Sequence, residues 1–134
     1  MKNVRVATLN TNIKGLFTHW LNLTSPFHNL SIKEKEILSL FLYYHHKLRK
    51  EVNNEDLLWK IVFDYETKLK IKEELKIKDY ALQNVMTSLR KKGAIQNKRI
   101  NPSFVPVLAE DVSNYKIVFN INIHDNKGHT KIIS

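Results

Sequence analysis

Basic side chains gather in one part of this chain of 134 residues. Residues 66–100 contain ten lysines and arginines and four acidic residues, so their local net charge of +6 (ten minus four) is two thirds of the +9 of the whole chain. Ammonium and guanidinium groups at this density attract anions, nucleic acid first. The alternative, a lysine-rich surface that keeps the protein soluble, explains lysine in general but not the clustering.

One helix in this region would carry side chains that can read bases. Apolar residues recur there with i, i+3, i+4, i+7 spacing, which predicts a helix with one buried stripe at Leu82, Val85, Met86 and Leu89. Its opposite face would expose Tyr80, Gln83, Asn84, Thr87, Arg90 and Lys91. Side-chain amides hydrogen-bond to adenine, and guanidinium groups to guanine, in the major groove. Alternatively, this face is solvated or packs on another protein.

Further basic residues would contact phosphates, which position a protein on nucleic acid without specifying sequence. These residues are Lys68, Lys70, Lys72, Lys92, Lys98 and Arg99.

A second helix should precede this one across a tight turn. Ile71 and Leu75 are four residues apart and would form its buried stripe. Asp79 stands where an N-cap carboxylate accepts hydrogen bonds from free amides of the first helical turn. The cations at 90–92 would complement the helix dipole, and Gly93 stands where a left-handed residue ends a helix. This order of elements predicts a helix-turn-helix.

The stretch K-I-K-E-E-L-K-I-K-D-Y-A-L-Q-N-V-M-T-S-L-R-K-K-G-A-I, residues 70–95, resembles the winged helix-turn-helix DNA-binding domains of phages and bacteria. In that family the second helix carries an Ile and a Leu, and the recognition helix ends L-x-K-K-G-x-I. The matching residues are Ile71, Leu75, Ile77, Leu82, Leu89, Lys91, Lys92, Gly93 and Ile95. The family usually has glycine after the leucine of the second helix, where this chain has Lys76.

The resemblance implies a mainly helical α+β fold, with three helices and a small antiparallel β wing over residues 31–123. Residues 1–30 would be an N-terminal arm or accessory segment and residues 124–134 a flexible or partner-dependent tail. The capping box Ser31-Ile32-Lys33-Glu34 would begin the first helix, which should run to about Lys50. Its buried stripe would be Ile37, Leu40, Phe41, Tyr44 and Leu48.

Three segments around these helices are candidates for strands. Residues 59–65 could continue a helix or form the small first strand, and their β-branched and aromatic residues favour the strand. Residues 94–100 should form the first wing strand. Apolar residues alternate from Tyr115 to Ile123, which predicts a strand paired with 94–100. Residues 107–114 would be a loop.

The N-terminal segment has a helix of its own. Residues 11–23 place Ile13, Leu16, Phe17, Trp20 and Leu21 at helical spacing. This apolar face would either cover the core or dock on a second copy or another protein. Residues 1–10 alternate weakly and could form a strand or an extended arm.

Composition excludes several classes of protein. The chain is 43% hydrophobic, as folded domains are. It has no cysteine, so disulfides, zinc fingers and thiol catalysis are all excluded. No apolar run is long enough to span a membrane. Glycine-rich phosphate loops and nucleophile motifs are missing, so we expect no enzyme, cofactor or small-molecule substrate. The adjacent His45 and His46 would point about 100° apart and are interpreted as surface or interface residues, not metal ligands.

The sequence therefore predicts a non-enzymatic protein that binds duplex DNA, with the helix 79–92 in the major groove and a basic wing on phosphates. It would act in transcription regulation or replication in the cytoplasm. The alternative is a structural subunit of a phage virion or its assembly, which would use the winged helix for protein contacts and reside in the host cytoplasm or the virion.

Overall fold

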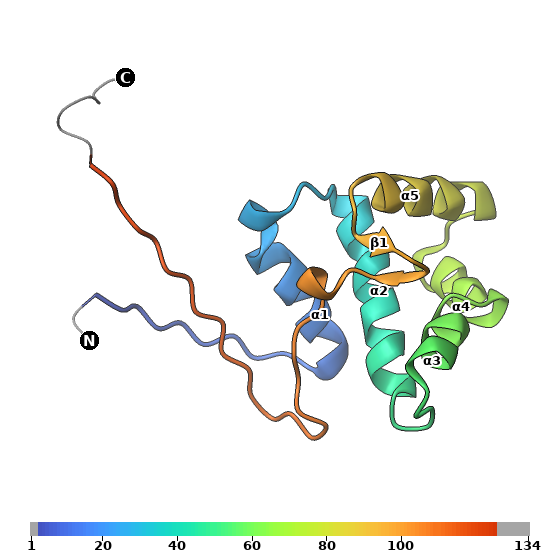
Figure 1. Ribbon diagram of the computed structural model, residues 1–134, viewed down its shortest axis with the longest axis horizontal. Helices are drawn as coiled ribbons and strands as arrows, with labels where there is room; N and C mark the ends of the chain where they lie inside the picture. Colours follow the sequence, from blue (N-terminus) through green and yellow to red (C-terminus); the bar gives the residue numbers. More distant parts are fainter. Residues whose placement is uncertain (1–2, 126–134) are drawn as a thin grey trace.

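The computed structural model describes residues 3–125, and these form a mainly helical α+β fold (Figure 1). The helices are α1 (Ile13–Leu23), α2 (Ile32–Leu48), α3 (Glu55–Val62), α4 (Tyr65–Leu75) and α5 (Asp79–Lys91). A two-stranded antiparallel sheet follows, with β1 (Ile95–Gln96) and β2 (Arg99–Ile100). Short 3₁₀ turns lie at Ser25–Phe27 and Pro102–Phe104.

Helix α2 runs through the middle of the molecule, with α1 on one side and α3 to α5 on the other (Figure 1). A helix packed on several sides buries more than one stripe. The predicted residues Ile37, Leu40 and Phe41 are buried, and so are Leu38 and Leu42 between them. The predicted Tyr44 and Leu48 are half-buried.

Helix α1 packs against α2 and covers one side of this core. Phe17 and Leu21 are completely or almost completely buried, and the indole nitrogen of Trp20 donates a hydrogen bond of 2.9 Å to the carbonyl of Phe104. The apolar face of residues 11–23 is therefore occupied within the chain by α2 and the segment after the sheet. Ile13, at the start of α1, remains exposed.

Side-chain caps set the helix starts. The capping box is confirmed, because Ser31 Oγ accepts from the amide of Glu34 at 3.2 Å and Glu34 Oε1 from the amide of Ser31 at 2.7 Å. Asn54 caps α3 through the amide of Leu57. The helix after Ser31 ends at Leu48, two residues short of the prediction.

The preference for a strand at 59–65 was wrong, because residues 59–62 lie in α3, Phe63 and Asp64 in the turn after it and Tyr65 at the start of α4. Leu58, Trp59 and Val62 recur at helical spacing and are buried together, and that packing outweighs the β propensity of single residues. Asp64 breaks the two helices apart, because its carboxylate accepts from the amide of Thr67 at 3.0 Å and caps α4.

The turn between α4 and α5 is tight. Lys76 ends α4 in the left-handed conformation with φ 56°, so a lysine adopts the backbone conformation usually taken by glycine. The expectation that Asp79 is an N-cap was wrong, because Lys78 occupies that position and Asp79 is the first helical residue. Its carboxylate instead accepts a hydrogen bond of 3.1 Å from Lys72 across the turn.

The predicted pairing of 94–100 with 115–123 was also wrong. Residues 95–100 form a hairpin by themselves, in which Ile95 pairs with Ile100. Its two central residues, Asn97 and Lys98, have φ of 52° and 62°, as a type I′ turn requires. Gly93 has φ 80°, which confirms its position as the left-handed residue after α5.

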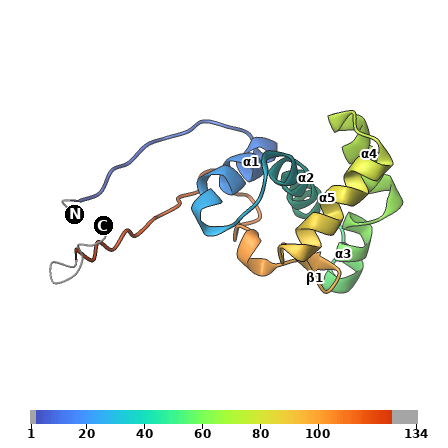
Figure 2. The ribbon, with the colours of Figure 1, turned by 90° about the horizontal axis from the view of Figure 1, so that it is seen from above.

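Two extended arms leave the helical part on the same side (Figures 1 and 2). Residues 5–11 and 113–125 form no backbone hydrogen bond that the structure records. The ring of Phe119 stacks on that of Phe27 at 5.8 Å, and Tyr115 meets Trp20 edge-on at 6.2 Å. Two of the alternating residues in 115–123 therefore contact the N-terminal segment, and none of them pairs in a sheet. The predicted tail, residues 124–134, lies outside the described residues beyond Asp125.

A buried carboxylate joins the start of α2 to the end of α5. Glu34 accepts hydrogen bonds from Lys92 Nζ at 2.7 Å and from the hydroxyl of Ser88, and Lys92 also donates to the carbonyl of Asn29 at 2.6 Å. Burial alone would raise the pKa of Glu34, but the hydrogen bonds from Lys92, Ser88 and the amide of Ser31, with the charge of Lys92, lower the pKa to about 2.

We predict that Gly93→Val lowers the free energy of unfolding by roughly 1–3 kcal/mol, because a β-branched side chain is strained at positive φ. Space is not the obstacle, since a Cβ at this position would meet only the side-chain amide of Gln96, at 3.4 Å. Gly93→Asn is the matched control, because asparagine tolerates this conformation. Chemical denaturation measures both variants, and equal stabilities for them would contradict the left-handed cap.

We predict that Glu34 makes the protein sensitive to acid. Its pKa is lowered from 4.5 to about 2 in the folded state, so its stabilisation is complete above about pH 4.5 and disappears as the pH falls toward 2. At about 1.36 kcal/mol per pKa unit, the loss amounts to about 3 kcal/mol. Glu34→Gln should therefore be less stable at neutral pH and lose less further stability below pH 4.5. The control is Glu36→Gln, which removes only an exposed ion pair with Lys33; identical acid titrations for the two variants would refute the assignment.

Candidate nucleic-acid interface

Helix α5 presents a polar face to solvent. Leu82, Met86 and Leu89 are buried on its inner side, so the packing against α2 and β1 fixes which side faces outward. The outer side exposes five of the six residues predicted there, Tyr80, Asn84, Thr87, Arg90 and Lys91. Gln83 is half-buried.

The predicted phosphate contacts divide into residues with and without an acidic partner. Three are in ion pairs within the fold, Lys72 with Asp79, Lys92 with Glu34 and Arg99 with Asp56. The hydrogen bond and charge of Lys72 lower the pKa of Asp79. Lys92 is the least available of the three, because it is also bound to the carbonyl of Asn29. In the other two pairs the carboxylates of Asp79 and Asp56 are exposed to solvent, so these pairs contribute little to stability. Lys72 and Arg99 could therefore exchange the carboxylate for a phosphate.

Four cations without a recorded ion pair among residues 3–125 line one cavity. Lys68, Arg90 and Lys98 were predicted from the sequence, and Lys60 was not. The predicted residues Lys70 and Lys91 have no recorded ion pair either, but they do not line the cavity. Lys70, two residues from Lys68, faces away from it and lies over the ring of Tyr44 on α2.

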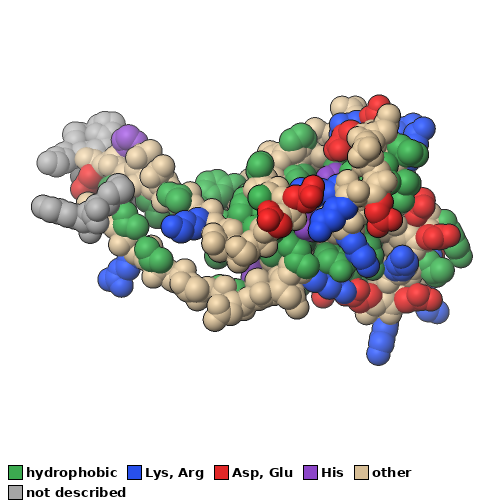
Figure 3. Space-filling view, turned by 90° about the horizontal axis from the view of Figure 1, so that it is seen from below, with side chains coloured by type: hydrophobic (Ala, Val, Ile, Leu, Met, Phe, Trp, Pro, Cys, Tyr) green, Lys and Arg blue, Asp and Glu red, His purple; other side chains and the backbone are tan. Residues whose placement is uncertain are grey.

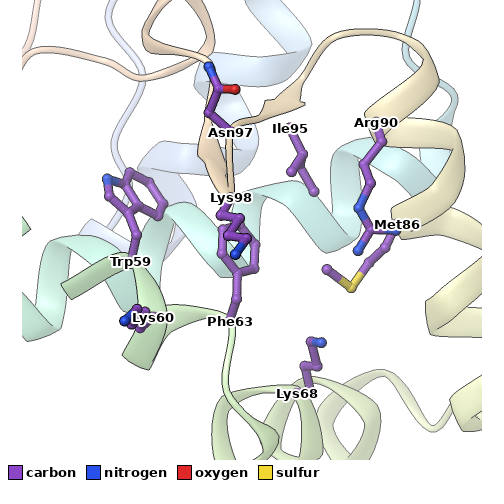
Figure 4. Close-up of a pocket in the computed structure, with 9 residues that line it drawn as sticks. All are labelled: Trp59, Lys60, Phe63, Lys68, Met86, Arg90, Ile95, Asn97 and Lys98. Carbon is purple, nitrogen blue, oxygen red and sulfur yellow. The ribbon is translucent and has the colours of Figure 1, made fainter. Parts of the chain in front are cut away.

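The cavity has a volume of about 490 Å³ and lies between α3, α4, α5 and the hairpin (Figure 4). Its apolar lining comes from Trp59, Phe63, Met86 and Ile95, and its polar lining from Lys60, Lys68, Arg90, Asn97 and Lys98. Figure 4 shows Lys68 and Arg90 extending into it from opposite sides. No acidic residue lines it.

Sequence reasoning missed the α3 side of this cavity because it favoured a strand at 59–65. In a strand Trp59 and Lys60 point to opposite faces, whereas in a helix Trp59 and Phe63 are on one face with Lys60 beside them. Asn54 before an acidic first turn at 55–56 is an N-cap pattern, which by itself predicts a short turn through Leu58, and the helix that it begins continues to Val62.

His45 helps to hold Trp59 in place. The two rings stack with centroids 4.0 Å apart, and the indole nitrogen of Trp59 donates to Glu55 at 3.0 Å. Burial lowers the pKa of His45, although the nearby Glu55 carboxylate opposes this. His45 is therefore a packing residue, and the interpretation of it as a surface or interface histidine was wrong. Over residues 3–125 no three or more His, Asp or Glu side chains cluster as metal ligands would.

Other surfaces differ from the cavity. On the face drawn in Figure 3, lysines and arginines are interspersed with acidic residues over the helices, and hydrophobic side chains appear along the arms. None of the helices in the described part of the chain combines the length and apolar character that crossing a bilayer requires.

Comparisons of the chain with protein-family models, with curated proteins and with solved structures found no match.

Proposed function

We propose that this chain is a winged helix-turn-helix protein that binds duplex DNA without catalysing a reaction, with α5 as the recognition helix. The observation that carries the proposal is the exposed polar face of α5 beside cations that lack acidic partners, Arg90 on α5, Lys68 on α4 and Lys98 in the hairpin. The run of α4, tight turn, α5 and hairpin, which follows α2 and α3, supports the fold assignment.

The residues divide by the chemistry they offer. Asn84, Thr87 and Arg90 would meet base edges in the major groove, since an amide, a hydroxyl and a guanidinium group distinguish base pairs there. Lys91 at the end of α5 and Lys98 at the tip of the hairpin would contact the backbone on either side. With two residues in each strand the hairpin is short, so its contact would be limited to the turn at Asn97 and Lys98.

We predict salt-dependent binding to any duplex. Neutralising about five phosphates gives a slope of log affinity against log salt on the order of −4 to −5. Lys98→Ala and Lys91→Ala should each flatten that slope by about one, because each removes one phosphate contact. Lys50→Ala, an exposed change beyond the far end of α2, is the matched control and should leave the slope unchanged. Fluorescence anisotropy measures the affinities, and failure to bind any duplex at about 50 mM salt would refute the proposal.

A second candidate function, structural assembly, is favoured by the C-terminal arm. Val118, Ile121 and Ile123 are each about four fifths exposed, and the backbone around them makes no recorded hydrogen bond. An extended apolar segment with free amides and carbonyls can pair with a strand of a second copy, and pairing centred on Phe119 would set Ile117 opposite Ile121. A virion or assembly subunit would use such an arm.

The assembly function predicts that the full chain forms dimers or larger oligomers in solution, and that the double variant Ile121→Lys, Ile123→Lys is a folded monomer. Both residues are exposed, so the changes should leave the helical core unaffected. Sedimentation without DNA measures the size, with circular dichroism to check folding. A monomeric wild-type chain at high concentration would eliminate this candidate.

A further inference from the structure

The cavity beside α5 has a cationic rim and an apolar floor, and an intact duplex bound to α5 would not use that floor. We propose that it receives one unpaired nucleotide, with the phosphate held by the cations at its rim and the base on its apolar floor. This inference rests on the proposed binding of DNA and specifies its form, a duplex that carries an unpaired nucleotide at an end or a flap.

The charges around the cavity favour an anion. Lys60 on α3, Lys68 on α4, Arg90 on α5 and Lys98 in the hairpin come from four separate elements and line one space with no acidic residue among them. Like charges brought together repel one another, and an anion between them removes that repulsion. The ammonium groups of Lys60, Lys68 and Lys98 can each donate hydrogen bonds to phosphate oxygens, so the guanidinium group of Arg90 remains free for a base edge.

The floor favours a planar apolar group. Trp59, Met86 and Ile95 are almost fully buried, whereas Phe63 is only partly buried. The ring of Phe63 is held by Trp59 at 5.8 Å and by Phe41 at 4.9 Å. An aromatic ring fixed in this way is a platform on which any base can stack, because every base has a π face.

The size of the cavity selects a single nucleotide. A volume of about 490 Å³ is in the range of small-ligand pockets and is far too small for a duplex. A base inside a duplex is stacked and paired, so only an unpaired or extruded one could enter. A free phosphate would leave the aromatic floor unused, and a purely apolar ligand would leave four cations without a counter-charge.

The position of the cavity connects it to the proposed duplex contact. Arg90 is exposed on α5 and also lines the cavity, one turn after Met86 in its floor. Lys98 likewise serves both the tip of the hairpin and the cavity rim. A strand that leaves a duplex on α5 would thus find the cavity next to its backbone.

The test compares three DNAs of equal duplex length, one blunt, one with a three-nucleotide 3′ overhang and one with a three-nucleotide 5′ overhang. One of the overhangs should tighten the Kd about tenfold relative to the blunt duplex, the size of effect expected for stacking one base. Lys60→Gln should abolish that gain without weakening binding to the blunt duplex, because Lys60 lines only the cavity. The matched control, Lys50→Gln, should keep the gain.

Trp59 gives a second measurement that does not depend on duplex binding. In a Trp20→Phe background it is the remaining tryptophan, and overhang DNA or a free deoxynucleoside monophosphate should quench its fluorescence. Phe63→Leu, which keeps an apolar side chain, should weaken the quenching.

The outcomes separate the two proposals. Equal binding of blunt and overhang duplexes, with Trp59 unaffected, overturns the nucleotide site and leaves duplex binding intact. Quenching by the free nucleotide without binding to any DNA supports the site, identifies the free nucleotide as its source and refutes the DNA proposal. If an acidic peptide quenches Trp59 while nucleotide and overhang DNA do not, the nucleotide site is wrong.

Discussion

The buried carboxylate of Glu34 constrains much of this molecule. An unpaired charge in a protein interior is strongly destabilising, so Glu34 must keep Lys92, Ser88 and the amide of Ser31 as partners. These partners come from the start of α2 and from the end of α5. The bond from Lys92 to Asn29 adds the loop before α2. The end of α5 is therefore fixed relative to the central helix, and the hairpin begins shortly after it, at Ile95.

From that fixed point the packing determines which way the functional groups face. With Leu82, Met86 and Leu89 buried against α2 and its neighbours, the polar side of α5 has to face solvent. Arg90 then extends over the same space as Lys68 and Lys98. Because Glu34 and Lys92 neutralise each other inside, the positive charge available to a partner lies farther out, around the cavity.

The ion pairs show why a count of basic residues overstates an interface. Lys72, Lys92 and Arg99 are as basic in sequence as Lys68 or Lys98, yet each is paired with an acid distant in the chain or across a turn. Lys60 was overlooked because its role depends on α3 being a helix. Charge clustering located the region, and the fold decided which of its cations are paired with acids and which line the cavity.

Local patterns in the sequence determined the helix between Asp79 and Lys91, the capping box at Ser31 and the left-handed Gly93, because each depends on residues within a few positions of one another. The tertiary structure decided the rest. Residues 59–62 became helical because burial of Trp59 and Val62 outweighed a weak β propensity. The alternation at 115–123 remained unpaired because the hairpin turn at Asn97 and Lys98 satisfies residues 95–100 locally. The cavity brings together side chains up to 39 positions apart, from Trp59 to Lys98, and no local pattern records such a distance.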